Sequence, residues 1–190
     1  MEERATATYS TRLNSGAWGI VSKQKAVGRW RYSFVIMRIR VLWEGKTKDA
    51  HLRALQSDLV SRIEHFAGLT VEEIAPLRMA GRRNEVKLSP SERKLLEKIR
   101  ESTKVFLDER GREWSSAEFA EWLGQQALRG TRELVFLIGG PEGFSAAFRK
   151  EADVLLALSR MTLTHDWART LLLEQIYRGF TILRGYPYPR

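Results

Sequence analysis

The stretch 137–144, which reads Leu-Ile-Gly-Gly-Pro-Glu-Gly-Phe, places three glycines directly after an apolar run. Glycine adopts backbone angles that are closed to other residues, and it lets a ligand approach the main chain closely. The stretch has neither the G-x-G-x-x-G pattern nor the lysine of phosphate-binding loops, and Glu142 would repel a phosphate. It therefore suits a ligand with an amine or hydroxyl groups, or a purely structural tight turn.

A second stretch, 158–165, reads Leu-Ser-Arg-Met-Thr-Leu-Thr-His and joins another apolar run to a long helical pattern. His165 and Arg169 are four residues apart, so both lie on one face of the predicted helix. A histidine at a helix start is more often structural than catalytic. The neighbouring arginine and the glycine-rich stretch make His165 a candidate for substrate contact.

The third candidate is the tail, 183–190, which reads Leu-Arg-Gly-Tyr-Pro-Tyr-Pro-Arg. Its tyrosines, prolines and arginines form a stiff aromatic and basic segment that suits base stacking and phosphate contact. The alternative is simple packing of Tyr186 against the folded body.

Composition narrows the classes of function. The 190 residues carry a net charge of +9, which favours a polyanionic partner such as nucleic acid. The chain has no cysteine, which excludes a disulfide scaffold and a thiolate metal site, and its three histidines are widely spaced. We expect no metal, no membrane span and no secretory signal, and a cytoplasmic protein.

Hydrophobic periodicity predicts strands alternating with helices. The predicted strands cover 38–43, 69–75, 103–107, 133–138 and 153–158. The predicted helices cover 49–66, 89–102, 115 or 116 to about 130, a short segment from 145, and 164 or 165 to 183. This succession indicates an α/β domain with a mainly parallel sheet and helices on both faces, and ligands then bind beyond the carboxyl ends of the strands.

In this order the motifs resemble one family. The segments that carry the resemblance are 106–111 (FLDERG), 136–143 (FLIGGPEG), 158–165 (LSRMTLTH), 173–178 (LEQIYR) and 184–188 (RGYPY). Together they resemble the RlmH family of SPOUT-class methyltransferases, which act on large-subunit ribosomal RNA. The resemblance covers 37–190, which we expect to form one SPOUT methyltransferase domain.

The resemblance implies a SPOUT-type α/β fold with a C-terminal trefoil knot and S-adenosylmethionine as methyl donor. It implies methylation of N3 of a pseudouridine in 23S ribosomal RNA, within the 70S ribosome or large subunit, by a homodimer with its site near the subunit interface. The implied cofactor residues are Leu107, Gly139, Leu158, Ser159, Arg160, Met161, Thr162 and Leu163.

Further residues are implied for the substrate. His165, Tyr188 and Arg190 match positions tied to catalysis or substrate recognition, and Arg169 and Arg184 are expected to contact RNA. Either His165 or Tyr188 would help to remove the proton from N3, because a protonated ring nitrogen is a poor nucleophile. The chain departs from the family at Pro189, where the tail usually has histidine, at Thr164, where proline is usual, and at the Glu44-Gly45 turn, which is usually Val-Gly.

Residues 1–36 have no recognised counterpart and no convincing period. They hold six Lys/Arg against Glu2 and Glu3, so +4 of the net charge lies there. The segment is either a transit-like or RNA-contacting arm, or an extension upstream of a true start at Met37, and we favour the extension. We expect it to be disordered or not native.

Two other functions stay open on the sequence. The first is a non-catalytic RNA-binding or ribosome-assembly protein with the same fold, which the replacement at Pro189 keeps open. The second, a dinucleotide-binding oxidoreductase, is distant because the glycine pattern does not match.

Overall fold

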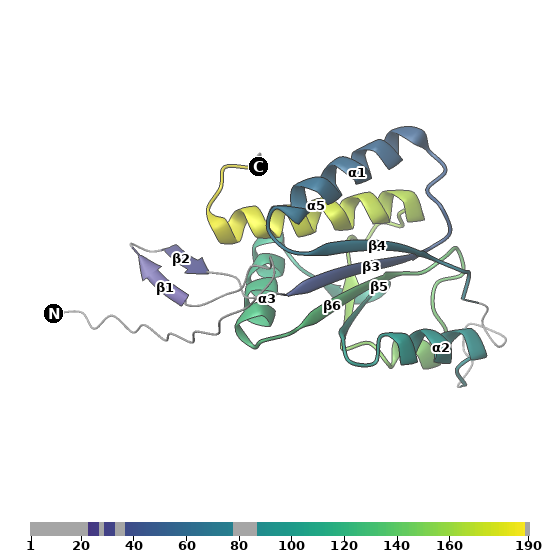
Figure 1. Ribbon diagram of the computed structural model, residues 1–190. Helices are drawn as coiled ribbons and strands as arrows, with labels where there is room; N and C mark the ends of the chain where they lie inside the picture. Colours follow the sequence, from purple (N-terminus) through teal and green to yellow (C-terminus); the bar gives the residue numbers. More distant parts are fainter. Residues whose placement is uncertain (1–22, 27–28, 33–36, 78–86, 189–190) are drawn as a thin grey trace.

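The structure, a computed structural model, describes residues 23–26, 29–32, 37–77 and 87–188. Its centre is a wholly parallel sheet with the strand order β4-β3-β6-β5-β7 (Figure 1). The strands are β3 (Arg38–Glu44), β4 (Leu69–Ile74), β5 (Thr103–Glu113), β6 (Glu133–Ile138) and β7 (Val154–Ala157). All five predicted strands are therefore confirmed, and so is the α/β class.

Helices cover both faces of this sheet. Helices α1 (Ala50–Glu64), α3 (Ser116–Leu128) and α5 (His165–Arg184) lie on one face, and α2 (Pro90–Lys98) and α4 (Ala146–Arg149) lie on the other (Figure 1). The central strand β6 contributes Leu134, Phe136 and Ile138 to the first face. It contributes Val135 and Leu137 to the second. An apolar run is required at this strand because both of its faces are buried.

Serines start the helices where the sequence predicts. The Ser89 hydroxyl accepts from the Glu92 N–H at 3.1 Å, and the Glu92 carboxylate accepts from the Ser89 N–H at 2.7 Å. Ser115 and Glu118 repeat this capping box at α3. Reciprocal caps satisfy backbone donors that a helix start leaves free. Helix α2 is shorter than predicted, because a turn in which Ser102 bonds to the Ile99 carbonyl follows Lys98.

The apolar face of α1 is only partly as predicted. Leu59 and Ile63 are buried, but Leu55 is 44% exposed. Gln56 takes the place expected for Leu55 and is 4% exposed. Its side chain accepts from the Thr47 hydroxyl at 2.9 Å and donates to the Thr170 hydroxyl at 3.0 Å. A buried amide is tolerated when it is hydrogen-bonded. The partners of Gln56 lie on two other segments, and the sequence does not reveal them.

Strand β5 differs most from the prediction. It was expected to end at Leu107, but it continues to Glu113 with an irregularity between Leu107 and Arg112. Its first half pairs with β7 through Val105 to Leu107, and its second half returns to pair Arg112 and Glu113 with Leu156 and Ala157. The chain thus folds over β7. Gly111 lies at the crossing, where an added Cβ would be 2.6 Å from the Leu155 carbonyl carbon.

Two short strands precede this core in the sequence. Strands β1 (Lys23–Ala26) and β2 (Arg29–Tyr32) pair antiparallel in the stretch for which the sequence predicted no regular structure. The loop predicted over 78–88 lies outside the described residues except for its last two positions. Within the described ranges no helix has both the length and the apolar character needed to cross a bilayer.

Candidate functional site

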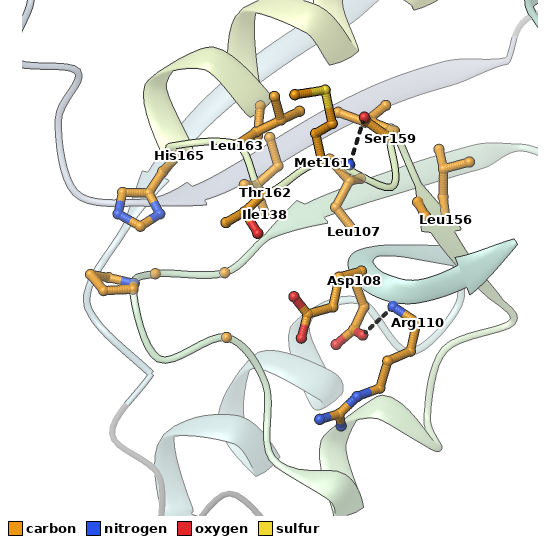
Figure 2. A pocket seen from close by; sticks show the side chains of 18 of the residues that line it. Leu107, Asp108, Arg110, Ile138, Leu156, Ser159, Met161, Thr162, Leu163 and His165 are labelled. Atoms are coloured by element: carbon orange, nitrogen blue, oxygen red, sulfur yellow. Dashed lines mark hydrogen bonds between the residues drawn. The ribbon is translucent and has the colours of Figure 1, made fainter. Parts of the chain in front are cut away.

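A cavity of about 200 Å³ opens at the carboxyl ends of three neighbouring strands. Strand β5 leads to it through Leu107 and Asp108, β6 through Ile138 and Gly139, and β7 through Ala157 and Leu158. The stretch 158–165 and the first turn of α5 close the other side (Figure 2). This is the edge at which ligands of open parallel sheets bind, as the sequence predicted.

The structure brings almost all the predicted cofactor residues together. Arg160 is exposed and is not among the residues that line the cavity. The predicted residues that do line it are Leu107, Gly139, Leu158, Ser159, Met161, Thr162 and Leu163. These residues belong to three segments that are far apart in the sequence, so their convergence is a property of the sheet order.

The stretch 158–165 is held as a turn by its own groups. The Ser159 hydroxyl accepts from the Met161 N–H at 2.9 Å, and the Met161 side chain is 78% exposed. His165 begins α5 and lines the cavity (Figure 2). Thr164, the residue before it, makes no side-chain cap bond with the helix. The histidine predicted to contact substrate is thus at the cavity and not in the core.

Four charged residues that were not among the predicted site residues also line the cavity: Asp108, Glu109, Arg110 and Arg149. Arg149 donates to the Phe144 carbonyl at 2.6 Å and lies 3.7 Å from the Asp108 carboxylate. The Arg110 N–H donates to the same carboxylate at 3.0 Å (Figure 2). Asp108 stands in one of the recognised motifs, and its place directly after Leu107 was the available signal. The lower wall therefore presents a carboxylate that can accept from ligand hydroxyls.

Comparisons with known proteins agree with this arrangement. The family model described as "Predicted SPOUT methyltransferase" matches residues 37–189. Two relatives are named ribosomal RNA large subunit methyltransferase H, and each match covers 80% of this chain. The protein from Trichlorobacter lovleyi is 42% identical and is covered over 99% of its length. A protein from Porphyromonas gingivalis is 39% identical and is covered over 98% of its length. The chain belongs to the RlmH family of SPOUT methyltransferases.

A solved structure, the SpoU methyltransferase AviRb from Streptomyces viridochromogenes in complex with AdoMet, is 19% identical with a TM-score of 0.39, over 73% of this chain and 56% of that one. SPOUT family membership rests on the family model and the sequence relatives. It makes the chain a methyltransferase that uses S-adenosylmethionine.

In this SPOUT methyltransferase Arg169 does not lie where an RNA contact needs it. The side chain is 3% exposed, and it donates to the Thr47 hydroxyl at 3.0 Å and to the Asp166 carboxylate at 2.9 Å. It also donates to the Glu44 carbonyl, and its guanidinium lies 5.3 Å from the Trp43 ring centre. Burial lowers the pKa of Arg169, and the charges of Asp166, Glu73 and Glu44 oppose this shift.

These contacts correct the expected role of Arg169. The residue ties the start of α5 to the turn after β3. The same first turn of α5 carries His165 and Ala168, which line the cavity. The sequence placed Arg169 on the His165 face correctly but could not show that β3 and the following turn bury this face.

Tyr188 and Arg184 lie at the other end of α5. Helix α5 has 20 residues, which corresponds to about 30 Å, so Tyr188 and the His165 cavity are far apart within one chain. The centroid of the Tyr188 ring lies 4.9 Å from the centroid of the Tyr177 ring and 4.5 Å from the guanidinium carbon of Arg178. Burial raises the pKa of Tyr188, with a further contribution from Glu174. Arg184 is exposed at the last position of α5, and Arg190 lies outside the described residues.

Glu44, one of the departures from the family pattern, contacts the glycine-rich stretch. A Cβ at Gly140 would lie 2.5 Å from the Glu44 carboxylate. Burial raises the pKa of Glu44, the N–H groups of Gly140 and Leu77 lower it, and the charge of Glu142 adds to the rise. Since the net shift is upward, burial outweighs the two hydrogen bonds, and the folded protein holds the proton more tightly than the unfolded chain.

This shift predicts a pH dependence. A group with a raised pKa in the folded state stabilises the fold below its ordinary pKa, and this contribution is lost as the pH rises through the folded value. We expect the free energy of unfolding of the natural protein, relative to Glu44→Gln, to fall between pH 4 and pH 7. Urea unfolding at both pH values measures the difference. A difference that is constant or grows with pH would contradict the assignment.

Proposed function

We propose that this protein transfers a methyl group from S-adenosylmethionine to N3 of a pseudouridine in large-subunit ribosomal RNA. The observation that supports it most is the convergence of three loops on one cavity at the carboxyl edge of the sheet. The relatives are named as methyltransferases of large-subunit ribosomal RNA. The net charge of +9 is suited to a polyanionic substrate.

The residues of the cavity fit this cofactor. Leu107, Ile138 and Leu163 offer an apolar surface for a purine ring, and Asp108 offers an acceptor for ribose hydroxyls. At Gly139 an added Cβ would lie 3.1 Å from the buried Phe144 ring, so glycine lets this loop pack closely against Phe144. When bound, S-adenosylmethionine supplies an electrophilic methyl group on a positively charged sulfur.

His165 is suited to the proton transfer that the nucleophile needs. The ring nitrogen N3 must lose its proton as it becomes methylated, and an imidazole can accept a proton near neutral pH. His165 lies at the cavity, on the first turn of a helix that Arg169 holds in place.

Tyr188 can share this site only across a dimer. Within one chain the length of α5 separates it from His165, so Tyr188 would have to approach the cavity of a second copy. A homodimer with two such composite sites is therefore part of the proposal, and so are a C-terminal trefoil knot, a ribosome-bound substrate and a cytoplasmic location. The stable packing of Tyr188 on α5 supports a preformed tail.

Two variants test the catalytic roles. We expect His165→Ala to lower kcat for methylation of unmodified ribosomes by about 100-fold or more, and Tyr188→Phe to lower it less, because general bases contribute about that much. Calorimetry with S-adenosylmethionine should show unchanged binding for Tyr188→Phe. Full activity of both variants would refute the roles. A natural protein that does not bind S-adenosylmethionine would favour the non-catalytic RNA-binding function.

Mixing the two impaired variants tests the shared site. In a symmetric dimer each mixed pair has one site with both natural residues, so random exchange adds about a quarter of the natural activity to what the two variants retain. If both residues acted within one chain, mixing would restore none. The measurement is the methylation rate after the two proteins have been mixed and allowed to exchange subunits.

A further inference from the structure

A second hollow, of about 380 Å³, lies on the α2 and α4 face of the sheet. Three of its lining residues are cations: Lys87 precedes α2, Arg93 lies near the α2 start, and Lys150 is the C-cap residue of α4. Glu151 is the carboxylate among its lining residues, so the hollow carries a formal excess of two positive charges. We call these three cations and the space between them the α2–α4 basic hollow.

Among the described residues, the three cations of the basic hollow have no salt-bridge partner. Other cations of the same half of the molecule are paired, such as Lys98 with Glu72 and Lys104 with Asp153. Within the described ranges no ion pair joins Lys87, Arg93 or Lys150 to any carboxylate, Glu151 included. All three residues are exposed.

Folding does not explain two of these charges. The start of a helix is its positive end, where a cation is unfavourable, and Lys87 and Arg93 both stand beside the start of α2. The favourable anion at this position is supplied by Glu92, which is buried in the capping box. Close, unpaired cations repel one another, and a polyanion that binds them relieves this repulsion.

The basic hollow is next to the cofactor cavity. Helix α4 has four residues, so it is about 6 Å long. Its Arg149 lines the cavity, whereas Ala147 and Lys150 line the basic hollow. The two openings are therefore on either side of one short helix. A strand that placed a base at the cavity could lay its adjacent backbone across α4.

We infer that the α2–α4 basic hollow binds phosphates of the ribosomal RNA strand whose base enters the cofactor cavity. The inference rests on the proposed ribosomal RNA substrate and adds the surface that positions it. Lys87, Arg93 and Lys150 contact the backbone and leave the reading of sequence to other residues, because phosphate contacts position a nucleic acid without identifying it.

The test removes two of the charges and keeps the side chains polar. The variant is Arg93→Gln with Lys150→Gln. The control, Lys94→Gln with Arg129→Gln, also removes two exposed charges: Lys94 is on α2 but does not line the hollow, and Arg129 is the C-cap of α3, before the amino end of β6. Both double variants change the net charge equally. Methylation of unmodified ribosomes gives KM and kcat at several salt concentrations.

We expect the Arg93/Lys150 variant to raise KM about 10-fold at moderate salt and to reduce the salt dependence of KM by about one power for each lost phosphate contact. The kcat at saturation and the affinity for S-adenosylmethionine should stay within twofold. The control should change KM by less than threefold. Equal effects of both variants, or no effect of the first, would overturn the inference.

A direct binding measurement separates this inference from the proposed reaction. Filter binding of labelled large-subunit ribosomal RNA to the natural protein and to both variants needs no methylation. If the natural protein proves inactive but the Arg93/Lys150 variant alone loses RNA affinity, the proposed reaction fails and the RNA surface stands. If the reaction is confirmed and RNA affinity is unchanged in that variant, the surface is wrong.

Discussion

Replacing Arg169 with methionine is expected to lower the free energy of unfolding by about 3 kcal/mol or more. The substitution removes a positive charge and the hydrogen-bond donors that satisfy its buried partners. The variant would leave the Asp166 carboxylate, the Thr47 hydroxyl and the Glu44 carbonyl without the donor that joins them. Methionine replaces the aliphatic part of arginine but offers no donor. Urea unfolding followed by circular dichroism measures the change.

The Arg169 variant should also lose affinity for the methyl donor. The Arg169 hydrogen bonds join the turn after β3 to the first turn of α5, and Leu163 and His165 in that region line the cavity. Without these hydrogen bonds, the cavity wall at the start of α5 is no longer fixed in position. We expect calorimetry to show binding of S-adenosylmethionine at least about 10-fold weaker, since each 1.4 kcal/mol corresponds to a factor of ten.

Arg62 provides the matched control for Arg169. Arg62 pairs with Asp58 on the outside of α1 and is half exposed. An exposed pair of this kind contributes little to stability, so Arg62→Met should be nearly neutral. Arg169→Lys should lie between the two, because lysine keeps the charge but not the planar fork. If Arg169→Met and Arg62→Met had the same free energy of unfolding, the Arg169 hydrogen bonds would not stabilise the fold.

Gly111→Ala is expected to have the second large effect. The new methyl carbon would lie 2.6 Å from the Leu155 carbonyl carbon and 2.7 Å from the Leu155 oxygen and the Leu156 carbonyl carbon. These are backbone atoms of β7, so they cannot give way as a flexible side chain would. We expect a loss of about 3 kcal/mol, at the upper end of the usual cost of overpacking. Thermal unfolding measures it.

Gly111→Ala should also disturb the cofactor cavity. The crossing of β5 over β7 carries Asp108 and Arg110 to the cavity. Gly68→Ala is the control, since its Cβ would meet only the Arg38 Cγ, at 3.9 Å. That variant should be neutral or slightly stabilising, because alanine restricts the unfolded chain. If both alanines left stability unchanged, β5 would not cross β7 as closely as described.

Local chemistry accounts for most of the secondary structure that could be predicted. Ser89 with Glu92, and Ser115, are capping patterns whose partners lie within a few residues, so they are legible without the fold. The apolar run of β6 likewise indicates burial on both faces from its own residues alone. Such signals depend on spacing along the chain, and the structure confirms them.

The errors share one cause, which is that they depend on partners distant in the sequence. Leu55 and Gln56 both fit a helix, and the Thr47 and Thr170 hydroxyls that bury Gln56 lie on other segments. Arg169 resembles an exposed cation until the turn after β3 covers it. The return of β5 at Gly111 needs the β7 backbone beneath it, which no local pattern reports.

The site divides in the same way. The glycine-rich stretch, the stretch 158–165 and His165 could be identified as chemically active from residue type and order, because side-chain chemistry is local. That they enclose one cavity, with Asp108 and Arg149 as its charged wall, follows from the placement of β5 between β6 and β7. Tyr188 belongs to the same motif set in the sequence, yet the rigid length of α5 puts it at the far end of the molecule. The predicted helix over 165–183 already implies this separation, because helix length is local. Only the tertiary structure shows that the tail turns back and packs Tyr188 against Tyr177 and Arg178 of α5.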